Sequence, residues 1–137
     1  MSLITALDIN ASALTAQRKR VEMASSNMAN SQTTRTEDGG PYRRKDVVFQ
    51  TTNFGNSLET AMNGVEVSAI VEDPTAFDRR YEPGHPDADK EGYVSYPNVN
   101  VMEEMANLVS AARSYEANIG SISIVKAMIN RTLEIGR

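Results

Sequence analysis

Apolar residues recur every seven positions along the last third of the chain, from residue 101 to residue 133. A repeat sustained over more than four heptads places a narrow apolar stripe on one face of an α-helix. At 1.5 Å per residue this helix is about 50 Å long, which exceeds the width of a compact domain of this mass. We therefore expect another long element to cover the stripe. The stripe comprises Val101, Met105, Leu108, Ala112, Tyr115, Ile119, Ile122, Lys126, Ile129 and Leu133.

A second helix is predicted over residues 3–30, where Leu7, Leu14, Val21 and Met28 also recur at intervals of seven. The segment is rich in alanine, which favours helix and permits close approach of a neighbouring backbone. Such helices are marginal alone, because most helical stability comes from packing. The last helix has its own start signal, since Asn100 is a good N-cap and Glu103 follows three residues later.

The middle of the chain has a different character. Residues 33–97 hold all five prolines and six of the eight glycines. Within this region residues 42–51 and 64–71 are rich in β-branched and aromatic residues and predict strands, and residues 76–81 and 92–96 add two shorter candidates. We therefore predict an α+β fold. It consists of an N-terminal helical part (1–32), a small loop-rich β module (33–97) and a C-terminal helical part (98–137), with the two helices packed as in a coiled coil.

The two helices could pair within one molecule as a hairpin, and this explains part of the heptad pattern. A hairpin buries only one seam, however, and the C-terminal helix carries a second, largely apolar line at Met102, Val109, Val125, Met128, Thr132 and Ile135. Polymeric packing is therefore the preferred interpretation, because an exposed stripe of this size favours aggregation. The predicted helix-packing and assembly interface comprises Leu7, Leu14, Val21, Met28, Val101, Met105, Leu108, Ala112, Tyr115, Ile119, Ile122, Ile129 and Leu133.

Composition narrows the function classes. A net charge of −4 and a pI near 5.0 argue against nucleic acid as the main partner. The absence of cysteine excludes disulfides and thiolate metal sites. No segment approaches the run of about 18 apolar residues that a membrane span needs. The N-terminus also lacks the pattern of a cleaved secretory signal, so we expect any export to use another route.

The sequence offers only weak candidates for a metal site or a catalytic site. Asp87, Asp89 and Glu91 precede Gly92 in a D-x-D-x-E-G pattern like the start of a calcium loop, but position twelve is Asn98 instead of a bidentate acid. The single histidine, His85, lies in a proline-rich turn without further zinc ligands or a nearby nucleophile. We therefore expect no catalytic, cofactor or metal site and no enzymatic activity.

Motifs near both ends resemble one known family. Residues 12–17 (SALTAQ) with 24–30 (ASSNMAN) are similar to the N-terminal signature of flagellar rod, hook and hook–filament junction proteins. Residues 97–101 (PNVNV), 104–105 and 111–118 (AARSYEAN) resemble their C-terminal signature. Residues 41–50 and 81–86 (YEPGHP) are closest to the proximal-rod members. Ser26 departs from the pattern, since many relatives have a second asparagine there, and the large inserted domain of hook and distal-rod proteins is missing.

This resemblance implies a non-enzymatic subunit of the proximal rod, the drive shaft of the bacterial flagellar basal body, which crosses the periplasm. It implies export by the flagellar type III apparatus. It also implies that the partners are other copies of the chain and other rod proteins. The main alternative is a soluble coiled-coil adaptor or chaperone that binds partner helices through the same stripe. A calcium-dependent enzyme or sensor is a third class, and it would require metal-dependent stability.

Overall fold

The computed structural model describes residues 3–53 and 63–136. Two long helices enclose four strands in the sequence, so the predicted α+β class is confirmed. The elements are α1 (Leu3–Ala29), β1 (Lys45–Asn53), β2 (Asn63–Glu72), β3 (Asp78–Tyr81), β4 (Tyr93–Tyr96) and α2 (Val101–Ile135).

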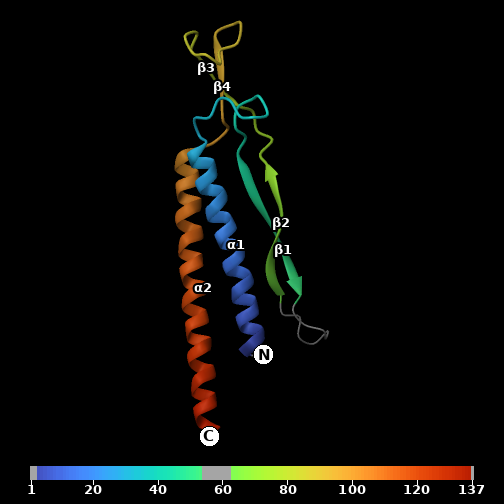
Figure 1. The fold of residues 1–137 in the computed structure, drawn as a ribbon, viewed down its shortest axis with the longest axis vertical. Coiled ribbons are helices and arrows are strands. Elements are labelled where there is room, and N and C mark those ends of the chain that lie inside the picture. Colours follow the sequence, from blue (N-terminus) through green and yellow to red (C-terminus); the bar gives the residue numbers. More distant parts are fainter. Residues whose placement is uncertain (1–2, 54–62, 137) are drawn as a thin grey trace.

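The two helices lie side by side and run in opposite directions, with both chain ends at the same end of the pair (Figure 1). The β1–β2 hairpin lies along α1, so α1 is sandwiched between α2 and this hairpin. The β3–β4 hairpin projects from the opposite end, where α1 finishes and α2 begins. Among the described residues, α1 is the only helix or strand that packs on α2.

Both hairpins are antiparallel and two-stranded. In the first, Val47 pairs with Ile70 and Thr51 with Val65, and the register shifts by one residue between Val48 and Phe49. In the second, Arg80 pairs with Val94. Because an isolated two-stranded ribbon is marginal in water, the long hairpin depends on the cover that α1 provides. The Ser12 hydroxyl accepts a hydrogen bond from the Val65 amide across this contact (3.2 Å).

The four predicted strands are present, but the first starts three residues later than expected. The amide of Tyr42 donates to the carbonyl oxygen of Thr33 (3.0 Å), and the amide of Arg44 donates to the Asn98 side chain (2.9 Å). These groups are therefore used outside the β1–β2 ladder. Strand propensity depends on neighbouring residues, so it does not predict hydrogen bonds to partners that are distant along the chain.

The start of α2 is as predicted. The side chain of Asn100 accepts hydrogen bonds from the amides of Met102 and Glu103, at 3.1 and 3.5 Å. Glu103 and Glu104 add negative charge to the first turn, where the helix dipole favours it. At the other end Gly136 caps the helix through a hydrogen bond from its amide to the Thr132 carbonyl.

The interior contains small residues in the helices and a few larger ones in the hairpins. Ala16 and Ala24 of α1 and Ala111 of α2 are almost fully buried. Alanine at buried positions lets two helix backbones approach closely, so the contact depends on fit more than on apolar volume. The other buried apolar residues are Val47, Val94, Tyr96 and Val125.

Candidate assembly surface

One line of α2 residues, which we call the inner seam, faces α1. Its members alternate three and four residues apart and are buried or half-buried, whereas most residues between them are exposed. Because α1 is the only described element that packs on α2, this line must lie against α1. The inner seam comprises Glu104, Leu108, Ala111, Tyr115, Asn118, Ile122, Val125 and Ile129.

The inner seam shares one heptad position with the predicted stripe and replaces the other. Leu108, Tyr115, Ile122 and Ile129 belong to both, and they are half-buried, as is the predicted Ala112. At the other heptad position, the residues that face α1 lie one residue earlier in the sequence than the predicted ones. They are Glu104, Ala111, Asn118 and Val125. Glu104, Ala111 and Asn118 in this line are polar or small, so a search for large apolar residues selected the neighbouring line. The predicted residues left exposed are Val101, Met105, Ile119, Lys126 and Leu133.

The four predicted positions on α1, namely Leu7, Leu14, Val21 and Met28, are all half-buried. This intermediate burial fits the position of α1 between two neighbours. The helix buries surface against α2 on one side and against β1 and β2 on another. Whether these residues also contact neighbouring subunits stays a prediction.

A buried carboxylate lies where the end of α1 and the first turn of α2 meet the residues just before β1. Glu104 is 2% exposed, and each of its oxygens accepts one hydrogen bond. Arg44 Nε donates to Oε1 (2.7 Å), and Asn27 Nδ2 donates to Oε2 (3.0 Å). A buried carboxylate is tolerated only when it is paired and hydrogen-bonded, and both conditions hold here.

Asn27 connects this carboxylate to the first strand. Its Oδ1 accepts hydrogen bonds from the Lys45 amide and from the Tyr42 hydroxyl, both at 3.0 Å. Its Nδ2 also donates to the Lys45 carbonyl (2.8 Å). A single side chain at the end of α1 therefore fixes the start of β1 and the first turn of α2 together.

Arg44 and Asn98 extend the network to the segment after β2. Arg44 Nη1 lies 3.3 Å from Asp73 Oδ2, and Asn98 Nδ2 donates to Thr75 Oγ1 (2.8 Å). Asn98 Oδ1 accepts from the Arg44 amide, as described above. We call this network the polar junction. Its members are Asn27, Tyr42, Arg44, Asp73, Asn98 and Glu104.

The junction shifts the protonation equilibria of two members. Partial burial disfavours the charged form of Arg44, but the hydrogen bond and negative charge of Glu104 outweigh it and raise the pKa of Arg44. The amide and hydroxyl of Thr75 donate to Asp73, and together with Arg44 they lower the pKa of that carboxyl. Both shifts favour the charged forms of Arg44 and Asp73 near neutral pH.

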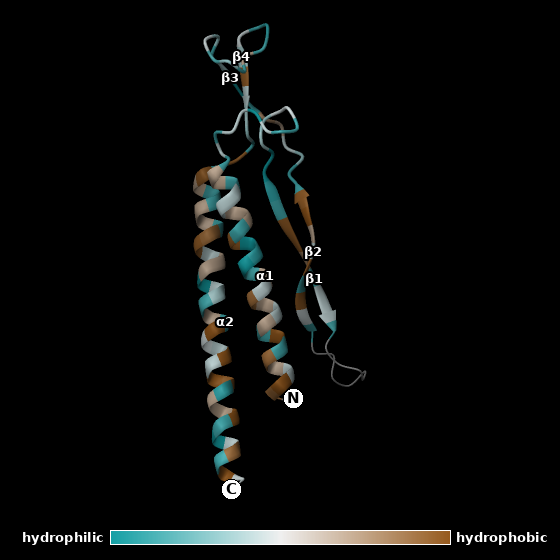
Figure 2. Ribbon diagram, viewed as in Figure 1, coloured by the Kyte–Doolittle hydropathy of each residue, from teal (hydrophilic) through white to brown (hydrophobic). Residues whose placement is uncertain are grey.

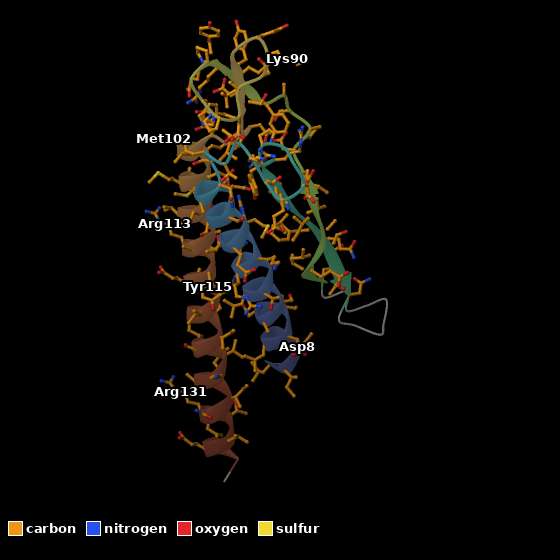
Figure 3. The ribbon with its side chains drawn as sticks, turned by 45° about the horizontal axis from the view of Figure 1, so that its top comes forward. Asp8, Lys90, Met102, Arg113, Tyr115 and Arg131 are labelled. Atoms are coloured by element: carbon orange, nitrogen blue, oxygen red, sulfur yellow. The ribbon has the colours of Figure 1, made fainter. Side chains whose placement is uncertain are left out.

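The side of α2 away from α1 is uncovered and carries exposed apolar residues together with charged ones. Met102, Arg113 and Arg131 all leave α2 on the side away from α1 (Figure 3). Apolar residues recur along the helix, including the part that extends beyond α1 (Figure 2). A shallow groove on this side is lined by Met102, Met105, Val109 and Arg113. The large apolar residues that α1 leaves exposed on α2 are Val101, Met102, Met105, Val109, Ile119, Ile124, Met128, Leu133 and Ile135.

The D-x-D-x-E-G segment forms a turn in which both aspartate carboxylates already have partners. Asp89 accepts hydrogen bonds from the Tyr93 and Glu91 amides (both 2.9 Å) and pairs with Arg79 (2.7 Å), and these contacts lower the pKa of Asp89. Asp87 accepts from the Thr34 hydroxyl (2.8 Å). Within residues 3–53 and 63–136 no cluster of three or more histidine and carboxylate side chains is arranged to hold a metal ion. In the same ranges neither helix is apolar enough, over a sufficient length, to cross a bilayer.

Comparison with known proteins identifies the family. The family description "Flagella basal body rod protein" matches residues 7–35, and "Flagellar basal body rod FlgEFG protein C-terminal" matches residues 90–135. The flagellar basal-body rod protein FlgC of Bacillus subtilis is 45% identical over 150 aligned positions and that of Salmonella typhimurium over 137, with complete coverage of both chains in each case. FlgC of Borreliella burgdorferi is 40% identical, with 98% of each chain covered. The chain belongs to the FlgC family of flagellar basal-body rod proteins.

The motifs that resemble the FlgC family meet in space. Asn27 comes from the N-terminal signature, Arg44 from the segment before β1, and Asn98 and Glu104 from the C-terminal signature. All four belong to the polar junction. The motifs are recognisable in the sequence, but their mutual contacts are not predicted from it, because the partners lie up to 77 positions apart along the chain. Ser26, which departs from the family pattern, lies 3.4 Å from the Tyr42 hydroxyl at the edge of the junction.

Proposed function

We propose that the chain is a structural subunit of the proximal rod of the bacterial flagellar basal body, which polymerises through its two terminal helices and transmits motor torque. Its partners would be other copies of itself and adjoining rod proteins. Membership of the FlgC family supports the rod role and argues against an enzyme or a soluble adaptor, since its members are structural rod proteins.

The observation that carries the assembly mechanism is the uncovered apolar side of α2. Contact with α1 accounts for the inner seam alone and leaves Met102, Ile124 and Ile135 at 75%, 64% and 87% exposure. Large apolar side chains left exposed along a whole helix are typical of protein–protein interfaces. We propose that neighbouring subunits cover it with helices of their own in coiled-coil-like packing.

The remaining parts of the proposal concern delivery and place. The subunit would be exported by the flagellar type III apparatus without a cleaved signal, and the rod it joins would cross the periplasm. The predicted interface positions on α1 would contact neighbours together with those on α2. A hairpin of two thin helices suits this role, because it stays incomplete until other subunits pack around it.

Ile119 offers a direct test of the assembly mechanism. It belongs to the predicted interface and is 45% exposed, so Ile119→Asp should preserve the helical circular dichroism of the purified subunit. In cells the variant should be secreted but should abolish rod formation and swimming, because the charge would be buried without a partner between subunits. Ile119→Leu is the matched control and should swim normally. Normal swimming of Ile119→Asp would refute the mechanism.

A further inference from the structure

Four charged residues repeat on the uncovered side of α2. Arg113 and Glu116 are followed, after 18 positions, by Arg131 and Glu134. Eighteen residues make five turns of an α-helix, so the second pair lies directly along the helix from the first. All four side chains are exposed, and within the described part of the chain none of them forms an ion pair. The subunit by itself therefore gives no role to these charges.

The order of the charges is self-complementary when one helix is reversed. Arg113 and Glu134 lie equally far from the peptide bond between residues 123 and 124, on opposite sides of it, and the same holds for Glu116 and Arg131. A two-fold axis at this point therefore sets Arg113 against Glu134 of a second copy and Glu116 against Arg131 of that copy. The symmetry duplicates both contacts, which gives four opposite-charge pairs. A parallel two-fold pair would instead set each charge against itself.

The surface between these charges suits close helix contact. Ala117, Gly120 and Ala127 are exposed and small, and Ile124 near the symmetry centre is 64% exposed. A Cβ added at Gly120 would meet no atom within 4 Å in the subunit. Glycine inside a helix costs about 1 kcal/mol relative to alanine, and nothing within the subunit requires it here. Approach of a second helix supplies a reason for it.

We infer that two copies of this chain pair through α2 as a closed antiparallel dimer, centred between residues 123 and 124, with the four charges fixing its register. With the axis at this point the two α2 helices, counted to the C-cap Gly136, overlap only over residues 111–136. The dimer therefore covers Ile124 and the small residues around it, and it leaves Met102, Met105 and Val109 open. It goes beyond the proposed rod role, because a two-fold contact cannot add a third copy and the dimer must dissociate before a subunit joins a polymer. It is a storage form of the subunit that masks the C-terminal part of the uncovered side of α2.

Sedimentation equilibrium on the purified full chain measures the pairing. The wild-type protein should form a species of twice the 15.0 kDa subunit mass, and raising the salt concentration should weaken it, because the charges lie at the rim. Glu116→Arg or Arg131→Glu alone should raise the dimer dissociation constant more than about tenfold, since each creates two like-charge contacts. A strictly monomeric wild-type protein would overturn the inference.

Charge exchange separates the antiparallel dimer from other roles of the same residues. Glu116→Arg with Arg131→Glu in one chain should restore dimerisation, because the opposed residues again carry opposite charges. Glu116→Arg with Arg113→Glu retains an opposite-charge pair three residues apart on one helix, but it sets like charges against each other across the dimer. It should remain monomeric. Equal rescue by both double variants would show that the charges act within one helix and would refute the pairing.

Single cysteines in this cysteine-free chain test the geometry independently. Ser123→Cys lies beside the proposed axis and should form a disulfide-linked dimer rapidly under mild oxidation. Ser110→Cys is equally exposed, but its two copies would lie about 40 Å apart and should not cross-link. Cross-linking of both variants at the same rate would indicate a parallel or random encounter. Because these readouts use soluble protein, their failure would leave the proposed rod assembly, which is judged by swimming, unaffected.

Discussion

Replacing Arg44 by methionine removes the cation from a buried carboxylate and tests the polar junction. Glu104 is 2% exposed and Arg44 only 15% exposed, so water cannot readily replace the lost partner. Breaking a buried ion pair from one side costs about 3–5 kcal/mol. We take about 3 kcal/mol, because Asn27 continues to donate to the second oxygen of Glu104. With a urea dependence of about 2 kcal/mol per molar, the unfolding midpoint should fall by about 1.5 M.

A second substitution, at Glu104, tests whether the unpaired buried charge causes this loss of stability. Glu104→Gln added to Arg44→Met removes the stranded charge and keeps an oxygen that accepts from Asn27. The double variant should therefore be more stable than Arg44→Met alone, although below wild type. The control is Arg35→Met, whose guanidinium is 76% exposed and 3.7 Å from Asp87, and it should change stability by less than about 0.5 kcal/mol. A double variant less stable than Arg44→Met in urea unfolding followed by circular dichroism would refute this reasoning.

Three further predictions concern the turn before β4, the response to acid and the end of α2. Gly92→Ala should lower the thermal midpoint by several degrees, because Gly92 has φ +83° and a Cβ there would lie 2.9 Å from the Tyr81 ring, whereas Gly84→Ala meets nothing within 4 Å and should change the midpoint little. The pKa of Asp73 is lowered in the folded protein, so its ionised carboxylate stabilises the fold at any pH above the ordinary pKa of aspartate. This stabilisation is lost as the pH falls through the lowered pKa. The stability difference between wild type and Asp73→Asn should therefore shrink below about pH 4, and a constant difference would contradict the assignment. Amides of residues 130–135 should exchange with solvent faster than those of residues 104–125, as measured by mass spectrometry, because every residue in that last stretch is exposed.

Local sequence signals predicted the elements well because those signals act over a few residues. Helix 3–30 was predicted and Leu3–Ala29 is found, and Asn100 caps α2 through its own side chain. The same signals did not indicate half of the α2 residues that face α1. Residues 104 and 105 are adjacent, and hydrophobicity favours Met105 for burial over Glu104. Only the partners supplied by α1 and by the start of β1 make burial of the glutamate tolerable.

By itself the sequence determined where the helices and strands lie, that the chain has no thiol chemistry, and, through its end motifs, to which family it is similar. These properties depend on residue type and short spacing. Tertiary structure decided which line of α2 faces α1, which carboxylate is buried, and which apolar residues remain uncovered. Those outcomes depend on contacts such as Asn27 with Glu104, whose free energy arises only when distant segments meet. The exposed side of α2 is therefore the surface left over after this internal pairing, and the assembly proposals rest on it.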